Sequence, residues 1–223
     1  MKTIIFSDTH LTTTFKARKY KFLEGIIKNA DKIIIAGDFW EGKLITFQEF
    51  INSDWKKLFP ILKQKHTVYV YGNHDKRKYS DKQVNLFSDQ QNEIYTFKEG
   101  DKTFIVKHGD TKKIKYSLIK NLMKTTRMSE VFFMKHFHED LEHILTKLFG
   151  PQILQVLFKK YNTVIKDLEK NELLENEYVI CGHTHAAEID LENHFINTGI
   201  IRHGIGQYVE IENGNITLKS KQY

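Results

Sequence analysis

Short uncharged runs of apolar residues recur along this chain, and each contains β-branched or aromatic side chains. Runs of this kind are typical of strands that are buried on both faces. Five of them precede polar clusters: Ile4–Phe6, Ile33–Ile35, Val68–Val70, Phe104–Val106 and Val179–Cys181. Four more stretches also predict strands: Ile94–Phe97, Phe195–Asn197, Tyr208–Ile211 and Ile216–Leu218. A turn signal at Glu212–Asn215 predicts a hairpin between the last two.

Two stretches between the early runs have apolar residues near helical spacing. They cover Phe15–Asn29 and Thr46–Gln64. The second is expected to bend or end at Pro60, because proline removes a helical hydrogen bond. Alternation of strand and helix implies right-handed crossovers and largely parallel pairing. We therefore expect an α/β (α+β) fold in which two packed mixed β-sheets are flanked by helices.

Residues 111–175 break this alternation with a long helical stretch. Its apolar residues form amphipathic stripes, and Gly150-Pro151 is expected to separate two helices. We expect one domain over residues 1–223, with residues 111–175 inserted as a helical cap. The aromatic and methionine side chains of the cap are open to two interpretations. They line an apolar substrate pocket suited to acyl chains, or they pack one helix against another.

Size and cysteine content narrow the class of protein. A chain of 223 residues can bury one sizeable core, and no apolar stretch approaches the ~20 residues that span a bilayer. The lone Cys181 cannot form an internal disulfide, which fits a reducing compartment. The first predicted strand follows Met1-Lys2 directly and leaves no room for a signal peptide. We therefore expect a cytoplasmic protein.

The net charge widens the choice of partners. A formal charge of +6 gives a surface that attracts anions. The partner is then a phosphorylated substrate, nucleic acid or an anionic membrane surface to which the protein attaches peripherally. A lysine-rich proteome gives the same charge with no such partner, so charge alone does not decide between these.

Polar clusters follow the first five runs, where each predicted strand ends. They are Asp8-Thr9-His10, Gly37-Asp38, Gly72-Asn73-His74-Asp75, His108-Gly109-Asp110 and Gly182-His183-Thr184-His185. In open α/β folds, residues just past the strand ends converge on one edge of the sheet. The spacing of Asp8 and His10 requires extended or turn backbone, because residues two apart on a helix diverge. The clusters predict a metal centre with oxygen and nitrogen ligands.

The order of these clusters resembles the pattern of the calcineurin-like metallophosphoesterase superfamily, which runs D-x-H, G-D, G-N-H-[DE], H and G-H-x-H. The resemblance extends over roughly residues 4–199. It implies two divalent ions ~3.5–4 Å apart, and a metal-bridging hydroxide that attacks a phosphodiester, phosphomonoester or pyrophosphate. Carboxylate, amide and imidazole ligands suit Mn²⁺, Fe or Zn²⁺, and we expect Mn²⁺.

The resemblance also implies which residues bind the ions. Asp38 is the carboxylate that both ions share. The other ligands form two sets, one of Asp8, His10 and His185 and the other of Asn73, His108 and His183.

Catalysis is implied to depend on His74, which directly follows the ligand Asn73 and would protonate the leaving oxygen. An acidic partner is needed to set its tautomer. Glu41 and Asp75 are both candidates, and the sequence does not choose between them.

Three residues are expected to support the site from its margins. Asn73 and Arg202 are candidates for contact with the substrate phosphate. Asp110 is a candidate for orienting a ligand histidine.

Three further interpretations of function remain open. The GDxxE form at Asp38–Glu41 and the helical insertion resemble the branch that contains the UDP-2,3-diacylglucosamine pyrophosphatases. That branch typically has Arg where His74 stands, and a Cys where this chain has Thr111–Lys113. Lys76-Arg77-Lys78 favours a nuclease or cyclic-nucleotide phosphodiesterase instead. A non-catalytic scaffold on the same fold is the third alternative, although such proteins generally lose ligands that are all present here.

Overall fold

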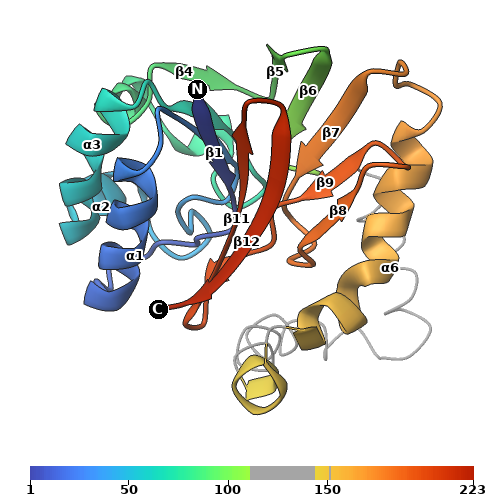
Figure 1. Ribbon diagram of the computed structural model, residues 1–223. Coiled ribbons are helices and arrows are strands. Elements are labelled where there is room, and N and C mark those ends of the chain that lie inside the picture. The colour runs from blue at the N-terminus through green and yellow to red at the C-terminus, as the bar shows by residue number, and fades with distance from the viewer. Residues whose placement is uncertain (111–143, 151) are drawn as a thin grey trace.

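The chain forms two β-sheets packed face to face, as a computed structural model describes for residues 1–110, 144–150 and 152–223 (Figure 1). The larger sheet has the order β10-β11-β1-β2-β3-β4, and β12 pairs with β11. Its strands are β1 (Lys2–Phe6), β2 (Lys32–Ala36), β3 (Val68–Val70), β4 (Gln90–Asn92), β10 (Ile201–Arg202), β11 (Ile205–Glu212) and β12 (Asn215–Gln222). β1 to β4 run parallel, whereas β11 is antiparallel to β1, β10 and β12.

The smaller sheet has the order β5-β6-β7-β9-β8. Its strands are β5 (Ile94–Glu99), β6 (Lys102–Lys107), β7 (Glu177–Cys181), β8 (Glu188–Asp190) and β9 (Phe195–Asn197). β6, β7 and β9 run parallel, and the two edge strands β5 and β8 are antiparallel to their neighbours. Both sheets are therefore mixed, and the predicted fold of two packed mixed sheets flanked by helices is confirmed.

Alternation along each strand places one set of side chains between the sheets. In β1, Ile5 faces the smaller sheet, while Ile4 and Phe6 face the helices on the other side. The layer between the sheets is filled by residues of both, among them Ile5, Ile34, Val68, Phe104, Val106, Ile180 and Ile196. This dry layer fixes how the ends of the two sheets lie relative to each other.

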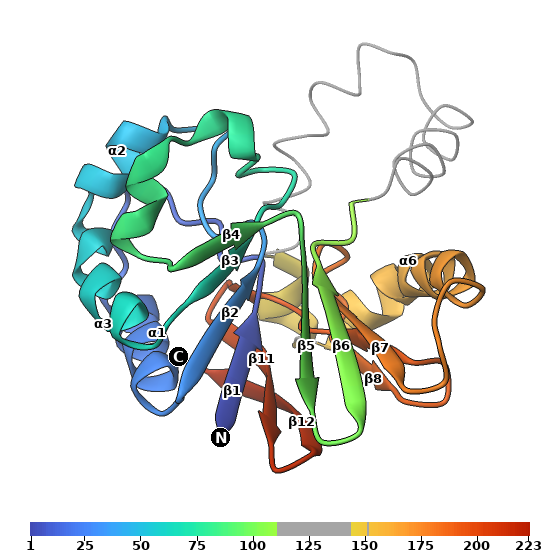
Figure 2. The same ribbon diagram turned by 90° about the horizontal axis from the view of Figure 1, so that it is seen from above.

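Helices cover the outer face of the larger sheet (Figure 2). They are α1 (Ala17–Lys28), α2 (Phe47–Asn52), α3 (Phe59–Gln64) and the 3₁₀ turns η1 (Asp54–Leu58), η2 (Arg77–Tyr79) and η3 (Lys82–Leu86). The predicted helical stretch over Thr46–Gln64 is confirmed as helical, but it divides at Ser53, so the break expected at Pro60 is wrong. A capping box at Thr46 starts α2, Ser53 ends it, and Pro60 lies in the first turn of α3, where proline has no helical hydrogen bond to remove.

One helix, α6 (Gln152–Glu169), covers the outer face of the smaller sheet. Ile165 packs there against Cys181 and Phe195. The predicted cap at 111–175 lies partly outside the described residues, and its division from the rest of the domain stays a prediction. Within the described part, residues 144–149 are helical and α6 ends at Glu169.

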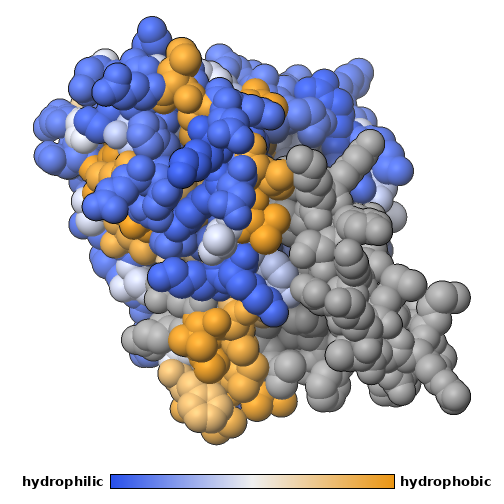
Figure 3. All heavy atoms as spheres, turned by 90° about the vertical axis from the view of Figure 1, so that its right-hand side faces the viewer, coloured by the Kyte–Doolittle hydropathy of each residue, from blue (hydrophilic) through white to orange (hydrophobic). Residues whose placement is uncertain are grey.

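Apolar side chains gather on the surface where the chain enters α6 (Figure 3). Leu148, Phe149 and Val156 are 68%, 64% and 76% exposed. They belong to the segment for which the sequence leaves a substrate pocket and helix packing open, and neither interpretation is decided by the described residues. No helix within those residues is long and apolar enough to cross a bilayer.

Candidate metal centre

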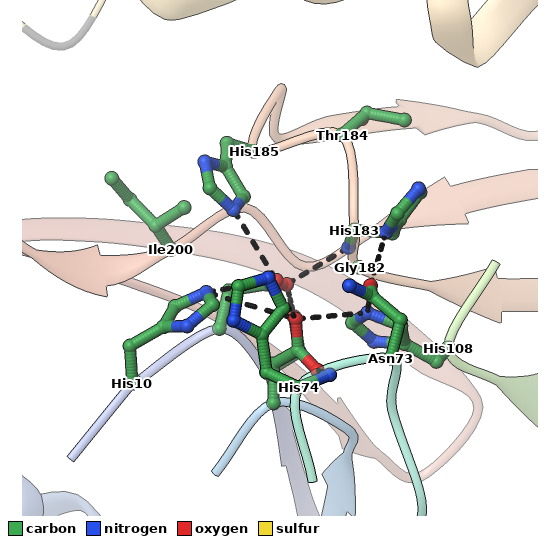
Figure 4. A network of polar contacts seen from close by, with 12 residues as sticks. His10, Asn73, His74, His108, Gly182, His183, Thr184, His185 and Ile200 are labelled. Carbon is green, nitrogen blue, oxygen red and sulfur yellow. Dashed lines mark hydrogen bonds and ion pairs between the residues drawn. The ribbon is translucent and has the colours of Figure 1, made fainter. Parts of the chain in front are cut away.

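The predicted ligands come together at one end of the sandwich, just beyond the carboxyl ends of parallel strands from both sheets (Figure 4). Loops after β1, β2 and β3 bring carboxylates and an amide from the larger sheet. Loops after β6 and β7 bring histidines from the smaller one. The nitrogen and oxygen atoms of two groups lie within 4.8 Å of one another: Asp8, His10 and His185, and Asp8, Asp38 and His108. This is the convergence that the strand-end clusters predict.

The first ligand set centres on Asp8. Its Oδ1 lies 3.4 Å from Nε2 of His185 and 3.7 Å from Nε2 of His10. His10 Nε2 is also 3.7 Å from Oδ2 of Asp38. The side-chain nitrogen and oxygen atoms of these four residues therefore lie close enough together to share one ion.

The second ligand set centres on Asn73. Its Oδ1 lies 2.8 Å from Nδ1 of His183 and 3.0 Å from Nε2 of His108. His108 Nε2 is 3.2 Å from Oδ2 of Asp38. The same oxygen of Asp38 therefore faces both sets.

Buried polar atoms without hydrogen bonds indicate a metal centre independently of any resemblance to a family. Among the residues that the structure describes, Asp8 Oδ1 and His10 Nε2 are buried and accept or donate no hydrogen bond. Buried polar atoms are otherwise almost always paired. Two such atoms facing each other at 3.7 Å need a cation or water between them.

The other polar atoms of the ligands are occupied, and this orients them. His108 Nδ1 donates to the carbonyl of Ala36 at 3.0 Å, which leaves Nε2 to face the ligand set. Asp110 is therefore not the group that orients His108. Asp8 Oδ2 accepts from the backbone N–H of His183 at 2.9 Å and from the hydroxyl of Ser7, which links the loops of the two sheets.

Charges within the site shift its titration in the metal-free protein. Burial would raise the pKa of Asp38, but the positive charge of His108 outweighs it and holds that pKa below its ordinary range. Burial would lower the pKa of His108, and Asp38 raises it to about 10. Burial and the charge of His108 lower the pKa of His183 to about 3. A divalent ion bound between Asp38 and His108 would take the place of the positive charge on His108.

Backbone conformation at the site is unusual. Asp8, His10, Asp38, His183 and His185 all have positive φ, between 45° and 65°. Non-glycine residues rarely adopt this left-handed region, and it costs roughly 1–3 kcal/mol each. Such strain persists where the surroundings hold the residue firmly.

Glu41 is the carboxylate that contacts His74. Its Oε1 accepts from Nδ1 of His74 at 2.6 Å, and its Oε2 accepts from Nδ1 of His10 at 2.8 Å. Burial would raise the pKa of Glu41, but its hydrogen bonds with both histidines hold that pKa below the ordinary range. One buried carboxylate therefore joins the predicted acid to a predicted ligand.

Asp75, the other candidate, has a different role. It accepts hydrogen bonds from the backbone N–H groups of Asp38, Phe39 and Gly72, at 3.1, 2.6 and 2.7 Å. Burial and the negative charge of Asp38 raise the pKa of Asp75 to about 6. Asp75 ties the loop after β2 to the loop after β3 and does not contact the ring of His74.

A buried polar network that the sequence did not predict supports the loop of His183 and His185. Thr184 donates from Oγ1 to Oδ1 of Asn162 on α6 at 2.6 Å. Asn197 donates to Gly182 O at 2.8 Å and to Thr184 Oγ1 at 3.0 Å. The amides of Asn162 and Asn197 gave no local signal, because their partners are distant in sequence.

Two basic residues singled out in the sequence have different surroundings. Arg202 lies on β10, where the neighbouring Ile201 N–H donates to Asp8 O at 3.4 Å, and its charge opposes the rise in the pKa of His10. Arg77 of the basic Lys76–Lys78 stretch stacks on Tyr71 and pairs with Glu93 at 3.6 Å. Arg202 is thus close to the loop of Asp8, whereas Arg77 is held by Tyr71 and Glu93, which line a pocket together with His108.

Comparison with known families gives one match that covers most of the chain. A family model described as the calcineurin-like phosphoesterase superfamily domain matches residues 1–209. No curated protein matches the chain.

Solved structures with a related fold share little sequence with this chain. A structure described as a novel archaeal phosphodiesterase is 16% identical over 100% of both chains, with a TM-score of 0.53. Yfce, a phosphoesterase from E. coli, is 15% identical over 96% of this chain and 89% of its own, with a TM-score of 0.48. Vps29 from Entamoeba histolytica, complexed with Zn²⁺, is 13% identical over 100% and 99%, with a TM-score of 0.49. At these identities only the fold is shared, and only the first likeness is strong enough to support that.

Proposed function

Because the chain belongs to the calcineurin-like phosphoesterase superfamily, we propose that it is a hydrolase that uses two divalent metal ions to cleave a phosphodiester, phosphomonoester or pyrophosphate bond. The observation that carries the proposal is the position of Asp38. Its Oδ2 lies 3.7 Å from His10 Nε2 and 3.2 Å from His108 Nε2, between the two ligand sets. A carboxylate in this position suits a pair of ions better than a single one.

The ions would be held by the two sets already described, with Asp38 in common. Manganese is our first choice, because the donors are carboxylate, amide and imidazole with no sulfur. When bound, two such ions supply Lewis acidity and a water that ionises near neutral pH.

The chain's own residues then supply proton transfer and orientation. His74 lies beside the ligand sets, with its Nε2 3.9 Å from Asp38 Oδ2, and we assign it the proton for the leaving oxygen. Glu41 accepts from Nδ1 of His74 and so fixes the ring with Nε2 toward the substrate side. Asp75 keeps the loops of Asp38 and Asn73 in register. Asn73 and Arg202 are proposed to bind the substrate phosphate.

A lipid-nucleotide pyrophosphatase is the narrower alternative. Glu41 in contact with His74 agrees with the GDxxE form of that branch. His74 itself replaces the arginine typical there, and the departure at 111–113 lies outside the described residues. We therefore propose the general activity, in a cytoplasmic protein.

Replacing His74 tests the assignment. We predict that His74→Asn lowers kcat for diphenyl phosphate about 10²- to 10⁴-fold, because phenolate leaves poorly without a proton. Bound manganese, measured by elemental analysis, should stay at the wild-type level. His66→Asn is the matched control, because His66 is exposed and pairs only with groups remote from the centre, such as Asp89. A wild-type protein that is loaded with manganese but inert on every ester would contradict the function, and an unaffected His74→Asn variant would contradict the role of His74.

A further inference from the structure

Lys43 lies in a tight turn that follows Glu41 directly. The N–H groups of Leu44 and Ile45 both donate to the carbonyl of Glu41, at 3.0 and 3.1 Å. A Cβ on Gly42 would overlap the carbonyl oxygen of His74, so this turn is pressed onto the His74 loop. The backbone therefore delivers the side chain of Lys43 to the site, although Lys43 itself is exposed.

The ammonium group of Lys43 contacts the reactive nitrogen of His74. Lys43 Nζ donates to His74 Nε2 at 2.6 Å. An ammonium group can only donate, and the carboxylate of Glu41 can only accept from Nδ1 of the same ring. The two contacts together place Glu41 at the Nδ1 side of the ring and Lys43 at its Nε2 side.

This arrangement places a second proton donor beside His74. Nζ of Lys43 and Nε2 of His74 lie 2.6 Å apart, so the two groups can present a proton to the substrate together. An oxygen that approaches Nε2 closely enough for a hydrogen bond also comes within reach of Nζ, which lies 2.6 Å from it. A charge-assisted bond from an ammonium group is among the stronger ones available to an oxyanion.

We propose that Lys43 is a further catalytic residue, which contacts the leaving oxygen of the substrate together with His74. The proposal rests on the phosphoesterase activity proposed above. The phosphorus–oxygen bond breaks and its electron pair goes to the leaving oxygen, while water supplies the oxygen that replaces it. The leaving oxygen takes a proton from the Lys43–His74 pair, and the proton released by water restores the pair through solvent.

Leaving groups of different basicity separate this role from a merely structural one. Phenolate needs a proton far more than p-nitrophenolate does, so diphenyl phosphate and bis-p-nitrophenyl phosphate are compared with manganese-loaded protein. We expect Lys43→Met to lower kcat for diphenyl phosphate about 10- to 100-fold, and for bis-p-nitrophenyl phosphate less than about threefold. Lys43→Arg, which keeps a charged donor, should lie between the two. Lys28→Met is the control for net charge, because Lys28 is exposed on α1 and pairs with Glu24.

A double variant tests whether the two residues act on the same oxygen. If they do, Lys43→Met/His74→Asn is hardly slower than His74→Asn alone. Equal losses on both esters would overturn the proposal in favour of a structural role, and so would additive losses in the double variant. An unchanged Lys43→Met enzyme would show that Nζ does not contact the leaving oxygen.

A second measurement does not depend on turnover. Nitrogen NMR of the His74 ring at one pH reports the contact directly, because the Nε2 resonance should move in Lys43→Met but not in Lys28→Met. Unmoved resonances would overturn the contact even in an active enzyme. A wild-type protein inert on both esters would overturn the phosphoesterase proposal and the leaving-group role with it. Activity on bis-p-nitrophenyl phosphate with no leaving-group effect would overturn only the role of Lys43.

Discussion

Glu41 holds two imidazole rings with one carboxylate, because each of its oxygens accepts from a different histidine. An amide in its place keeps one acceptor and turns the other atom into a donor, which then faces an imidazole N–H. We predict that Glu41→Gln weakens manganese binding about 10- to 100-fold and also lowers turnover of diphenyl phosphate. Calorimetric titration and steady-state rates measure the two effects.

Glu192→Gln is the matched control, because Glu192 is exposed in the turn after β8. Wild-type manganese affinity in Glu41→Gln would mean that the orientation of His10 does not depend on this carboxylate.

Gly72 lies against Asp38, the proposed shared ligand. A Cβ on Gly72 would overlap the carboxylate and the backbone nitrogen of Asp38. We predict that Gly72→Ala abolishes tight manganese binding and lowers the free energy of unfolding by about 1–3 kcal/mol. Gly25→Ala on α1 meets no atom within 4 Å, and should raise that free energy by up to about 1 kcal/mol. Denaturant titrations compare the pair, and equal stability of the two variants would refute the steric argument.

For individual residues, the sequence predicted which side chains lie close together, but not which hydrogen bonds they form. Asp8, Asp38, His108 and His183 each follow a recognisable strand, so their meeting could be anticipated. The choice between Glu41 and Asp75 could not, because both are close to His74 in sequence or by motif. Only the loop path shows that Asp75 turns back onto backbone N–H groups. Lys43 gave no signal, since lysines are common in exposed turns.

Elements with strong apolar runs were predictable, and short polar ones were not. The strands over Ile4–Phe6 and Val179–Cys181 were confirmed within a few residues. β4 and β8 were missed because Gln90–Asn92 and Glu188–Asp190 carry little of the apolar pattern that marks a strand. They pair at the edges of the two sheets, where half-exposed polar residues are tolerated.

Helix α6 is fastened to the smaller sheet by charge as well as by packing. Lys166 on α6 pairs with Glu188 Oε1 at 2.8 Å and with Asp190, both on β8. Burial would raise the pKa of Asp190, but its hydrogen bonds with Lys166 and Asn193 lower it. A lowered pKa means that this pairing stabilises the fold above the ordinary pKa of an aspartate, and that the contribution is lost as the pH falls through the folded-state value.

We predict that Lys166→Met lowers the free energy of unfolding at pH 7 by roughly 1 kcal/mol. The difference from wild type should shrink as the pH falls below about 4 and through the lowered folded-state pKa of Asp190, because protonation of Asp190 removes its ion pair with Lys166. Urea titrations of both proteins at pH 7 and below about pH 4 measure this difference in the free energy of unfolding. Lys160→Met, on the exposed part of α6, is the control. A difference that grows in acid would contradict the expected loss of this ion pair on protonation.

The candidate metal centre lies between the two sheets of the molecule. Asp8, Asp38 and Asn73 belong to loops of the larger sheet, and His108, His183 and His185 to loops of the smaller. Ions bound between them stabilise only the packed sandwich. We predict that EDTA lowers the Tm of manganese-loaded protein by roughly 10–20 °C. Each of the two sites contributes about 2.7 kcal/mol at a hundredfold excess of ion over Kd, and each kcal/mol corresponds to about 2–4 °C.

Scanning calorimetry with and without EDTA measures the shift. Asp38→Asn removes the shared carboxylate while its backbone still tolerates a positive φ, so EDTA should leave the Tm of this variant almost unchanged. An EDTA effect equal in both proteins would mean that the ions bind elsewhere.

The two-sheet architecture was within reach of the sequence, because the count of strands and helices admits few arrangements. The roles of the segments that follow His108 were harder to predict from the sequence. The helical pattern of 111–175 predicted one insertion, yet α6 within it covers the smaller sheet and supplies Asn162 to the loop of Thr184. Periodicity shows that a helix has an apolar face, but not which surface that face will cover.

The left-handed backbone at Asp8, His10, Asp38, His183 and His185 bears on how this protein is dissected. Alanine at these positions removes a donor atom and keeps the full penalty of the backbone, so an alanine scan mixes two losses. Glycine also removes the donor atom, but it relieves the backbone penalty. In the metal-free protein, a substitution by glycine should therefore raise the free energy of unfolding, whereas the substitution by alanine should not. Comparing alanine and glycine at one position therefore separates the contribution of the side chain to ion binding from the energy of the strained backbone.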